Sequence, residues 1–358
     1  GALYFQHENF YTIISRNFNE NINQKIFLRS HHPSIYLKNR KNDISFFGFK
    51  NQWITVQIGN GNEDWGAGEG ISLALSEYSD PYDYILLASN YGKIQVRYIH
   101  GFLESLDGNI NRYLNARGIE WTNNNNINIG LSESVVYSGV DRSLDIGYLN
   151  PIASHLEIEL NNRLNLYGDT HSNAVWQFHI NYLYKNNTKL SFNYLLDEIV
   201  LDPEIELDKE NGKAFSFQIS NNLVLSEDSK MDLYFTYMHV GTPTFRHSSG
   251  SNNFIVNKRP LSWISGSDVQ DICLGINYNS EKLNILLTTG FFENGDETTL
   301  KQPYDPYKDY LKSSFPSGKS FKSAYFDTYL KIWIKNNISL SSGYCLTNFI
   351  NTDEKKID

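Results

Sequence analysis

The stretch QIGNGNEDWGAGEG, residues 57–70, places five glycines around an acidic and an aromatic residue, Asp64 and Trp65. Glycine-rich turns after a strand can bind nucleotide phosphates, but the dinucleotide fingerprint requires a glycine five residues after its first. That position holds Asp64 when counted from Gly59 and Ile71 when counted from Gly66. This stretch also lacks the Gly-Lys-Ser/Thr sequence of a Walker loop. We therefore expect a tight glycine turn that packs the Asp64–Trp65 pair against a wall, with no phosphate bound.

The sequence gives little sign of catalytic or metal chemistry. Asp197 and Glu198 are adjacent on a strand-like segment, so their side chains point to opposite faces and cannot act on one substrate together. The nine histidines are dispersed without metal-ligand spacing, and no Gly-x-Ser-x-Gly elbow occurs. We predict no catalytic residue, metal or cofactor. Cys273 and Cys345 fit small inward-facing positions, and the sequence leaves a disulfide between them open.

The composition combines many aromatic residues with a hydrophilic average. Phe, Trp and Tyr make up 14% of the 358 residues, yet the mean hydropathy is −0.44 and the net charge is −9. A polar-lined barrel with an aromatic outer surface shows this combination. No apolar run approaches the roughly 20 residues of a membrane-spanning helix. The acidic balance gives no reason to expect nucleic acid as a partner.

Apolar and polar residues alternate along most of the chain, as in strands with two different faces. Examples are 53–58, 93–99, 174–184, 190–196, 214–220 and 326–334, in which amides, hydroxyls and small residues oppose bulky apolar ones. The pattern predicts an all-β fold, a transmembrane outer-membrane β-barrel of about 14–18 antiparallel strands. A soluble β-sandwich or β-helix is the alternative. We predict one domain over residues 1–358, with 1–50 assigned least clearly.

The connections are expected to be uneven. Asn186-Asn187 and Ser280-Glu281 look like tight turns, whereas 104–126, 139–155, 240–269 and 293–323 look like long loops. Short turns on one rim and long extracellular loops on the other are typical of outer-membrane barrels. The long loops contain residues suited to sugar hydroxyls and C–H faces: Arg112, Tyr113, Trp121, Phe245, Arg246, His247, Trp263, Tyr304 and Tyr307. Rim packing or a membrane-interface girdle is the alternative role for each aromatic residue.

Two carboxylates conflict with the alternation. Glu133 shares the parity of the apolar residues around it, so we expect a bulge near Gly130, or a strand that turns Glu133 into the lumen. Inside the lumen its expected partners are Arg97 and Arg142. Asp197 and His179 have lumen parity, and Glu198 falls on the apolar face, near a rim or at a bulge.

Several motifs resemble those of the capsule-assembly Wzi-like outer-membrane proteins. They run in order from Asp64-Trp65-Gly66-Ala67-Gly68, then Leu73-Ala74-Leu75-Ser76 and Pro81, through RYIHGF with Arg97, IGLSESVVYSG with Glu133, YLNP with Asn150, YLLDEI with Asp197, to RPLSWISGSD with Asp268. The resemblance covers about residues 51–292. Two features depart from it: Ala116 precedes Arg117 where many relatives have a histidine, and the family's helical portion is not evident.

The resemblance implies a closed barrel in the bacterial outer membrane, its signal peptide removed, that binds capsular polysaccharide or exopolysaccharide without catalysis. Its partners would be outer-membrane lipid, lipopolysaccharide and other cell-surface components. The residues expected to bind polysaccharide or form a lumen network are Asp64, Trp65, Arg97, Arg117, Glu133, Asn150, Asp197, Arg246, Trp263 and Asp268. Two other functions stay open: a diffusion porin or substrate channel, and a soluble β-rich enzyme acting on polysaccharide.

Overall fold

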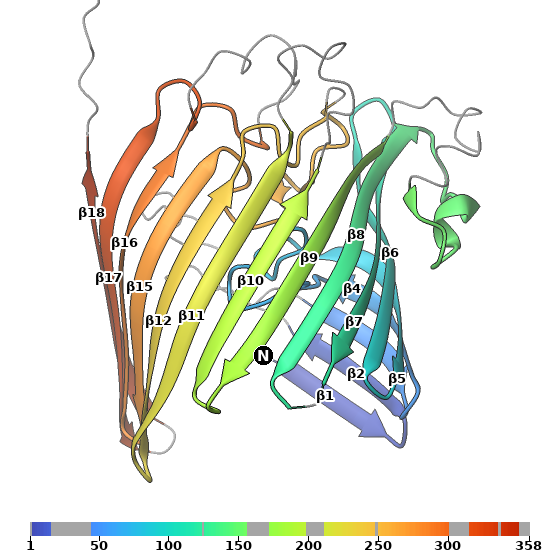
Figure 1. The fold of residues 1–358 in the computed structure, drawn as a ribbon. Coiled ribbons are helices and arrows are strands. Elements are labelled where there is room, and N and C mark those ends of the chain that lie inside the picture. The colour runs from blue at the N-terminus through green and yellow to red at the C-terminus, as the bar shows by residue number, and fades with distance from the viewer. Residues whose placement is uncertain are drawn as a thin grey trace, which may run out of the picture.

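The computed structural model describes residues 2–15, 44–123, 125–155, 172–197, 211–247, 250–300, 315–335 and 338–350. In these residues sixteen strands form one sheet, in which each strand pairs with its neighbours in chain order (Figure 1). A separate two-stranded hairpin is formed by β13 and β14. All pairings are antiparallel, which confirms the predicted all-β class and places the strand number within the predicted range.

The strands of the large sheet are mostly nine to fifteen residues long from β5 onward. Residues before position 51, which the sequence assigned least clearly, supply β1 to β3 of this same sheet. The strands are β1 (Ala2–His7), β2 (Phe10–Ser15), β3 (Ile44–Lys50), β4 (Ile54–Gly61), β5 (Tyr82–Tyr91), β6 (Ile94–Leu106), β7 (Ile110–Thr122), β8 (Ile127–Val140), β9 (Ser172–Tyr184), β10 (Thr188–Leu196), β11 (Lys213–Ser226), β12 (Ser229–Val240), β13 (Ile255–Val256), β14 (Arg259–Pro260), β15 (Val269–Ser280), β16 (Leu283–Asn294), β17 (Phe321–Lys335) and β18 (Ile338–Phe349).

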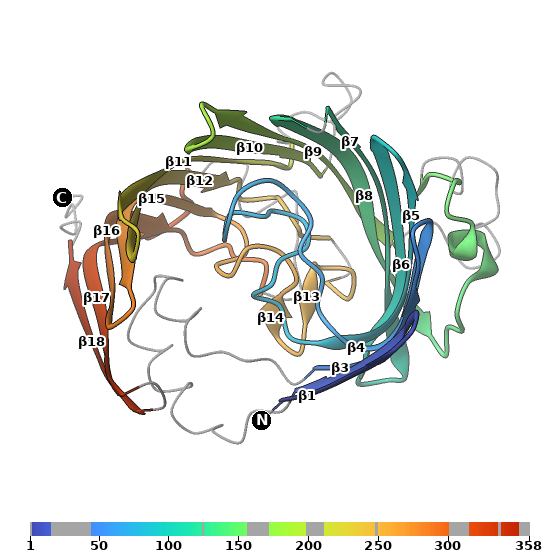
Figure 2. The same ribbon diagram turned by 90° about the horizontal axis from the view of Figure 1, so that it is seen from below.

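The sheet curls round a central space, and its two faces differ as the alternation predicts (Figure 2). Outward-facing apolar side chains are exposed, among them Ile58 at 55% and Leu131 at 58%. Inward-facing polar side chains are buried, among them Asn193 and Asp327. The apolar exterior suits contact with lipid, and the polar interior suits a hydrated or packed lumen. Among the described residues, no helix has the length and apolarity needed to cross a membrane.

Short turns gather at one end of the sheet, which we call the short-turn rim. They join β5 to β6, β7 to β8, β9 to β10, β11 to β12 and β15 to β16. Longer connections leave the opposite end of the sheet, the long-loop rim, after β4, β8, β12 and β16. The expectation of a long loop over 104–126 is wrong, because β6 and β7 run through it and meet in a turn at 107–109.

Two connections fold into the central space, where Figure 2 shows them inside the ring of strands. The glycine segment, residues 62–81, joins β4 to β5, and the hairpin segment, residues 241–268, joins β12 to β15 and carries β13 and β14. They contact each other through the Ser76 amide, which donates to the Leu261 carbonyl at 3.1 Å. The main apolar core lies here, between these segments and the inner wall, and includes Trp65, Leu73, Phe254 and Trp263.

One connection folds the other way. Residues 141–155, which we call the outer flap, follow β8 and contain a short 3-10 turn, η1 (Ile146–Leu149), that lies outside the ring of strands (Figures 1 and 2). The flap covers outward-facing residues of β6, β7 and β8, so that Tyr98 and Tyr137 are buried although they point away from the lumen. Cys273 and Cys345 are free thiols.

Candidate functional site

The predicted site residues fall into three groups, of which the first centres on Trp65 in the glycine segment. Trp65 is 1% exposed, and the Arg97 guanidinium lies 4.7 Å from the centre of its ring. The indole nitrogen donates to the Glu63 carboxylate at 3.2 Å. Arg97 also pairs with Glu120, which faces inward from β7. Trp65 is therefore packed inside the barrel, as expected for a plug, with no face free for a sugar.

Asp64, next to Trp65, is exposed to the lumen space, yet neighbouring side chains replace much of its hydration. Loss of hydration therefore raises the pKa of its carboxyl above the usual value, and the nearby Glu63 acts in the same direction. The positive charge of Arg97 opposes this shift. Asp64 and Arg97 thus belong to one electrostatic group.

Four amide side chains of the inner wall clamp the glycine segment, and one of them, Asn181, accepts from the Gly68 amide at 3.2 Å. Asn193 accepts from the Ala67 amide at 2.6 Å and donates to the Ala67 carbonyl at 2.9 Å. Gln218 contacts both backbone groups of Glu69 in the same way, at 3.0 and 3.1 Å. Gln177 accepts from the Ala74 amide at 3.0 Å and donates to the Trp65 carbonyl at 2.9 Å. These bonds satisfy backbone groups that burial would otherwise leave unpaired, at a cost of about 1–3 kcal/mol each.

Gly68 sits in this clamp with a φ of +83°, a conformation that favours glycine. A Cβ at this position would lie 2.6 Å from the Ile71 side chain and 3.2 Å from the Gln218 amide oxygen. We expect Gly68→Ala to lower the free energy of unfolding by about 1–3 kcal/mol, measured by urea titration in detergent micelles. The matched control is Gly92→Ala, because Gly92 has a φ of +70° but nothing within 4 Å of the added Cβ. Equal losses in the two variants would contradict a tight clamp at Gly68.

The second group lies where the hairpin segment meets the long-loop rim. The Arg246 guanidinium pairs with Glu297 at 2.9 Å, and the Asp197 carboxylate accepts from the Phe245 amide. Asp268 accepts from the Thr242 hydroxyl at 2.8 Å and from the Glu297 and Ser317 amides at 3.1 and 2.9 Å. All of these charged residues are buried. The Asp197 and Asp268 carboxylates hold loop backbone in place by accepting from amides. The Arg246–Glu297 pair joins the hairpin segment to the connection after β16.

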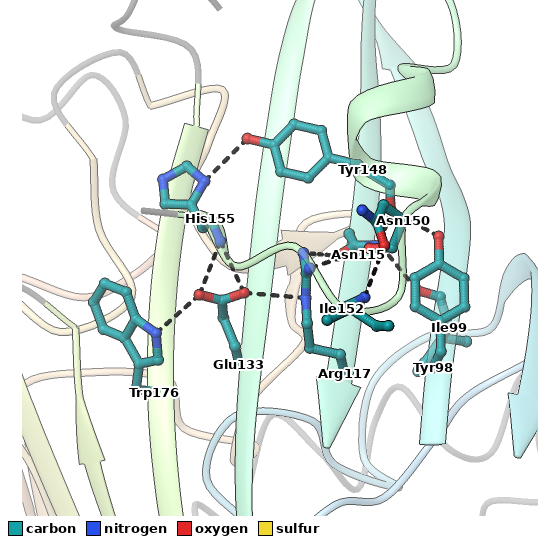
Figure 3. Close-up of polar contacts among 10 residues, drawn as sticks. All are labelled: Tyr98, Ile99, Asn115, Arg117, Glu133, Tyr148, Asn150, Ile152, His155 and Trp176. Carbon is teal, nitrogen blue, oxygen red and sulfur yellow. Dashed lines mark hydrogen bonds and ion pairs between the residues drawn. The ribbon is translucent and has the colours of Figure 1, made fainter. Parts of the chain in front are cut away.

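The third group is a polar cluster under the outer flap, shown in Figure 3. The Glu133 carboxylate lies between Arg117 Nε at 3.1 Å and the Trp176 indole nitrogen at 2.9 Å, and it accepts from the His155 amide at 3.1 Å (Figure 3). Arg117 also donates to the Asn150 carbonyl at 3.3 Å. Three predicted residues, Arg117, Glu133 and Asn150, are thus brought together, but on the outer face of the barrel.

The flap backbone completes this cluster. The Tyr148 carbonyl accepts from the side-chain amide of Asn115 and from the Tyr98 hydroxyl, each at 2.8 Å. The Tyr148 ring stacks on the Tyr137 ring, with 4.4 Å between the ring centres. The Tyr148 hydroxyl meets His155 Nδ1 at 3.0 Å. Polar groups on the outer wall therefore find their partners in the flap.

The expectations for Glu133 are corrected by this arrangement. The pairing of β8 with β7 and β9 has no register shift, so there is no bulge near Gly130 and the side chain keeps its outward parity. Its partner is Arg117, whereas Arg97 pairs with Glu120 and Arg142 with Asp145. The flap resolves the conflict, because it covers the carboxylate and supplies a backbone donor. Asp197 and His179 face inward as predicted; Glu198 lies outside the described residues.

Most of the residues that the sequence suggested for sugar contact are buried. Arg112 and Tyr113 belong to β7, and Arg112 donates to the Ser251 and Asn253 carbonyls of the hairpin segment. Phe245, Arg246 and Trp263 are buried, and Trp121 lies at the short-turn end of β7. Tyr304 and Tyr307 lie outside the described residues. The packing alternative therefore fits the buried loop residues.

The sequence reasoning missed the residues that hold the plug. Gln177, Asn193 and Gln218 were recognised only as part of a polar strand face, and their alternation with aromatic residues was the available signal. Tyr148 and His155 of the flap were also missed. Within the described ranges, no group of three or more His, Cys, Asp or Glu side chains is placed to hold a metal ion.

Comparisons with known proteins agree with this architecture. No protein-family model matches the sequence, and no curated protein matches it. Among solved structures, the chain is similar to Wzi of Escherichia coli, described as an outer membrane protein involved in group 1 capsule assembly and a carbohydrate-binding β-barrel, with a TM-score of 0.63 and 12% identity over 98% of this chain and 74% of Wzi. OccK10 of Pseudomonas aeruginosa aligns with a TM-score of 0.46 and 10% identity over 97% of this chain and 86% of its own.

At this identity the similarity to Wzi shows a shared fold. It confirms, at the level of fold, the resemblance that the ordered sequence motifs indicated. The chain has the fold of an outer-membrane β-barrel, with two connections packed in its lumen and one folded over its outer wall.

Proposed function

We propose that this chain is an outer-membrane β-barrel that binds surface or capsular polysaccharide and catalyses no reaction. The apolar outward face would contact outer-membrane lipid and lipopolysaccharide. The observation that carries the proposal is the packed lumen: the glycine and hairpin segments occupy the space that a diffusion channel keeps open. The carbohydrate binding described for Wzi, which shares the fold, supports the same function.

A polar surface suited to glycan hydroxyls lies at the long-loop rim. The turn between β13 and β14 exposes Asn257 and Lys258, and the Asn257 amide donates at 3.3 Å to Glu104, which lies near the end of β6. Arg259 pairs with Asp80 of the glycine segment at 3.4 Å and is partly exposed. Carboxylate, amide, ammonium and guanidinium groups are thus gathered from three parts of the chain, and such groups bind sugar hydroxyls.

Binding of capsular polysaccharide from the source bacterium to the purified barrel in micelles tests this function. We expect the unaltered chain to bind, and Lys258→Gln/Arg259→Gln to bind about tenfold more weakly for each charge-assisted hydrogen bond that is removed. Biolayer interferometry on immobilised polysaccharide gives the affinities.

The matched control is Lys93→Gln/Lys185→Gln, which removes two exposed positive charges at the short-turn rim. Lys185 has a positive φ, as Lys258 has, so the backbone setting is also matched. If the unaltered chain binds no polysaccharide, the proposed function is wrong. If both double variants bind as the unaltered chain does, the surface at the β13–β14 turn is not the binding surface.

A further inference from the structure

A cavity of about 760 Å³ lies beside the glycine segment and is lined by it, by Trp263 of the hairpin segment and by residues of β9 to β12, β15 and β16. Its lining reaches from Asn186, Asn187 and Asn222 near the short-turn rim to Tyr78 and Trp263 of the two inner segments. The volume lies within the roughly 300–1,000 Å³ range of small-ligand sites. The cavity is therefore large enough for a ligand that enters from the short-turn side, opposite the proposed glycan surface.

The charge in this cavity is strongly unbalanced. Its lining includes four carboxylates, Glu69, Glu77, Asp232 and Asp271, but only one ammonium group, Lys189, which gives a formal balance of −3. Asp232 accepts hydrogen bonds from Asn222 and Asn277, and Asp271 accepts one from Tyr325. The donors in these hydrogen bonds are neutral, and they hold the two carboxylates in place.

Glu69 and Glu77 differ from the two aspartates. Both are exposed, and within the described ranges neither carboxylate has a hydrogen-bond or ion-pair partner. Loss of hydration and repulsion by Asp64 and Glu69 raise the pKa of Glu77 above its usual value. A cation between these side chains would relieve that repulsion.

Aromatic side chains line the same cavity. Tyr78 and Trp263 of the two inner segments border the cavity but are almost fully buried, whereas Tyr234 of β12 is half-buried and lies near Glu69. Ring faces attract ammonium and guanidinium groups within about 6 Å of the ring centre and also pack against the apolar stem that carries the charge. Carboxylates, aromatic rings and Asn side chains together suit a ligand with cationic ends and an apolar stem.

We propose that the lumen cavity binds an amine- or guanidinium-bearing ligand that enters from the short-turn rim. The ammonium group would lie near Glu69 and Glu77, and its stem would pack toward Tyr234. A free polyamine and a basic peptide segment share this chemistry. Anionic ligands are disfavoured, because like charges brought together in a confined site are costly. The inference does not rest on glycan binding at the opposite rim.

Isothermal titration of the full chain in detergent micelles tests the proposal with four probes: spermidine, tetralysine amide, neutral maltohexaose and tetraglutamate. We expect binding of at least one cationic probe, weakening as salt concentration rises. A tighter complex with spermidine identifies a free polyamine as the ligand, and one with tetralysine identifies a peptide. The absence of binding by both, or equally tight binding of maltohexaose or tetraglutamate, would overturn the proposal.

The decisive variant is Glu69→Gln/Glu77→Gln, which removes two charges and preserves side-chain shape. We expect it to weaken binding of the cationic probe by about tenfold for each carboxylate that no longer pairs with an ammonium group. Glu281→Gln is the matched control, because Glu281 is exposed in the β15–β16 turn at the same rim and does not line the cavity. Unchanged affinity in the double variant would also overturn the proposal, provided that its urea midpoint equals that of the control.

Discussion

Replacing residues 64–78 by a short Gly-Ser linker is expected to turn a non-conducting barrel into one that conducts ions steadily in a planar bilayer. The strands on either side should stay paired, because Gly61 and Tyr82 face each other across β4 and β5 and a short turn can join them. The clamp residues Gln177, Asn193 and Gln218 would then be hydrated by lumen water, so their polar groups stay satisfied. The apolar core around Trp65 and Leu73 is lost, so we expect a lower free energy of unfolding for this variant.

The matched control for this deletion is the same linker placed across residues 143–152 of the outer flap. That change removes a similar element, but from outside the ring of strands, so it should leave the conductance at baseline. A steady open pore in the unaltered chain would contradict the packed lumen and favour the channel alternative. If the deletion variant does not conduct ions in the bilayer, the hairpin segment alone blocks the lumen.

The second large effect is expected at Glu133. The Glu133 side chain lies about 20 Å from the short-turn rim, counted along the strand from the turn at Asn125. This height falls within the outward-facing apolar band of an outer-membrane barrel, which is roughly 25 Å tall. Glu133→Leu leaves the Arg117 charge without its carboxylate partner in this setting, so we expect a loss of about 3–5 kcal/mol in the free energy of unfolding. Urea titration in micelles, followed by tryptophan fluorescence, measures the loss.

Arg117→Leu/Glu133→Leu should recover part of that stability, because no charge then needs a partner, whereas the Trp176 indole and the His155 amide still lose their acceptor. The double-mutant cycle separates the coupling of the pair from the cost of each truncation. Arg259→Ala serves as the surface control: its pair with Asp80 is partly exposed, and we expect a change of about 1 kcal/mol or less. A double variant no more stable than Glu133→Leu would contradict the ion pair as the source of the loss.

The sequence predicted the fold best where each strand has one lipid-facing and one lumen-facing side. In β4, β11 and β17 the apolar residues point outward and the amides or carboxylates inward, so alternation alone identified them. The glycine segment was also correctly placed inside, since its glycines failed the phosphate spacing and needed another explanation. These predictions depend on local pattern and on a uniform environment along the strand.

Prediction failed at β7, where polar residues occupy both faces. Arg112 points inward to the hairpin segment, whereas Asn115 and Arg117 point outward to the flap. The hairpin segment and the flap, which supply these partners, are distant from β7 in the sequence. Because β7 has polar residues on both faces, it lacks the apolar–polar alternation that predicts a strand, and the sequence therefore predicts a loop. The same reason explains Glu133: nothing in its own strand reveals that residues 141–155 will cover it.

The partners of the inner carboxylates were beyond sequence reasoning for a related cause. Asp197 and Asp268 bind backbone amides of Phe245, Glu297 and Ser317, and an amide carries no sequence signature of its own. The inward parity of Asp197 was predictable, but its acceptor role was not. Long connections therefore limit what a sequence can say about this barrel more than its strands do.

The clamp on the glycine segment has a consequence for the order of assembly. Its four amide residues follow the groups that they bind by 103 to 149 positions along the chain. Residues 62–81 are therefore made early but cannot reach their final contacts until β9, β10 and β11 have joined the sheet. Contacts of such sequence separation form slowly. The growing barrel must pass through a stage with a wet interior, and the lumen is sealed only when the second half of the wall is in place.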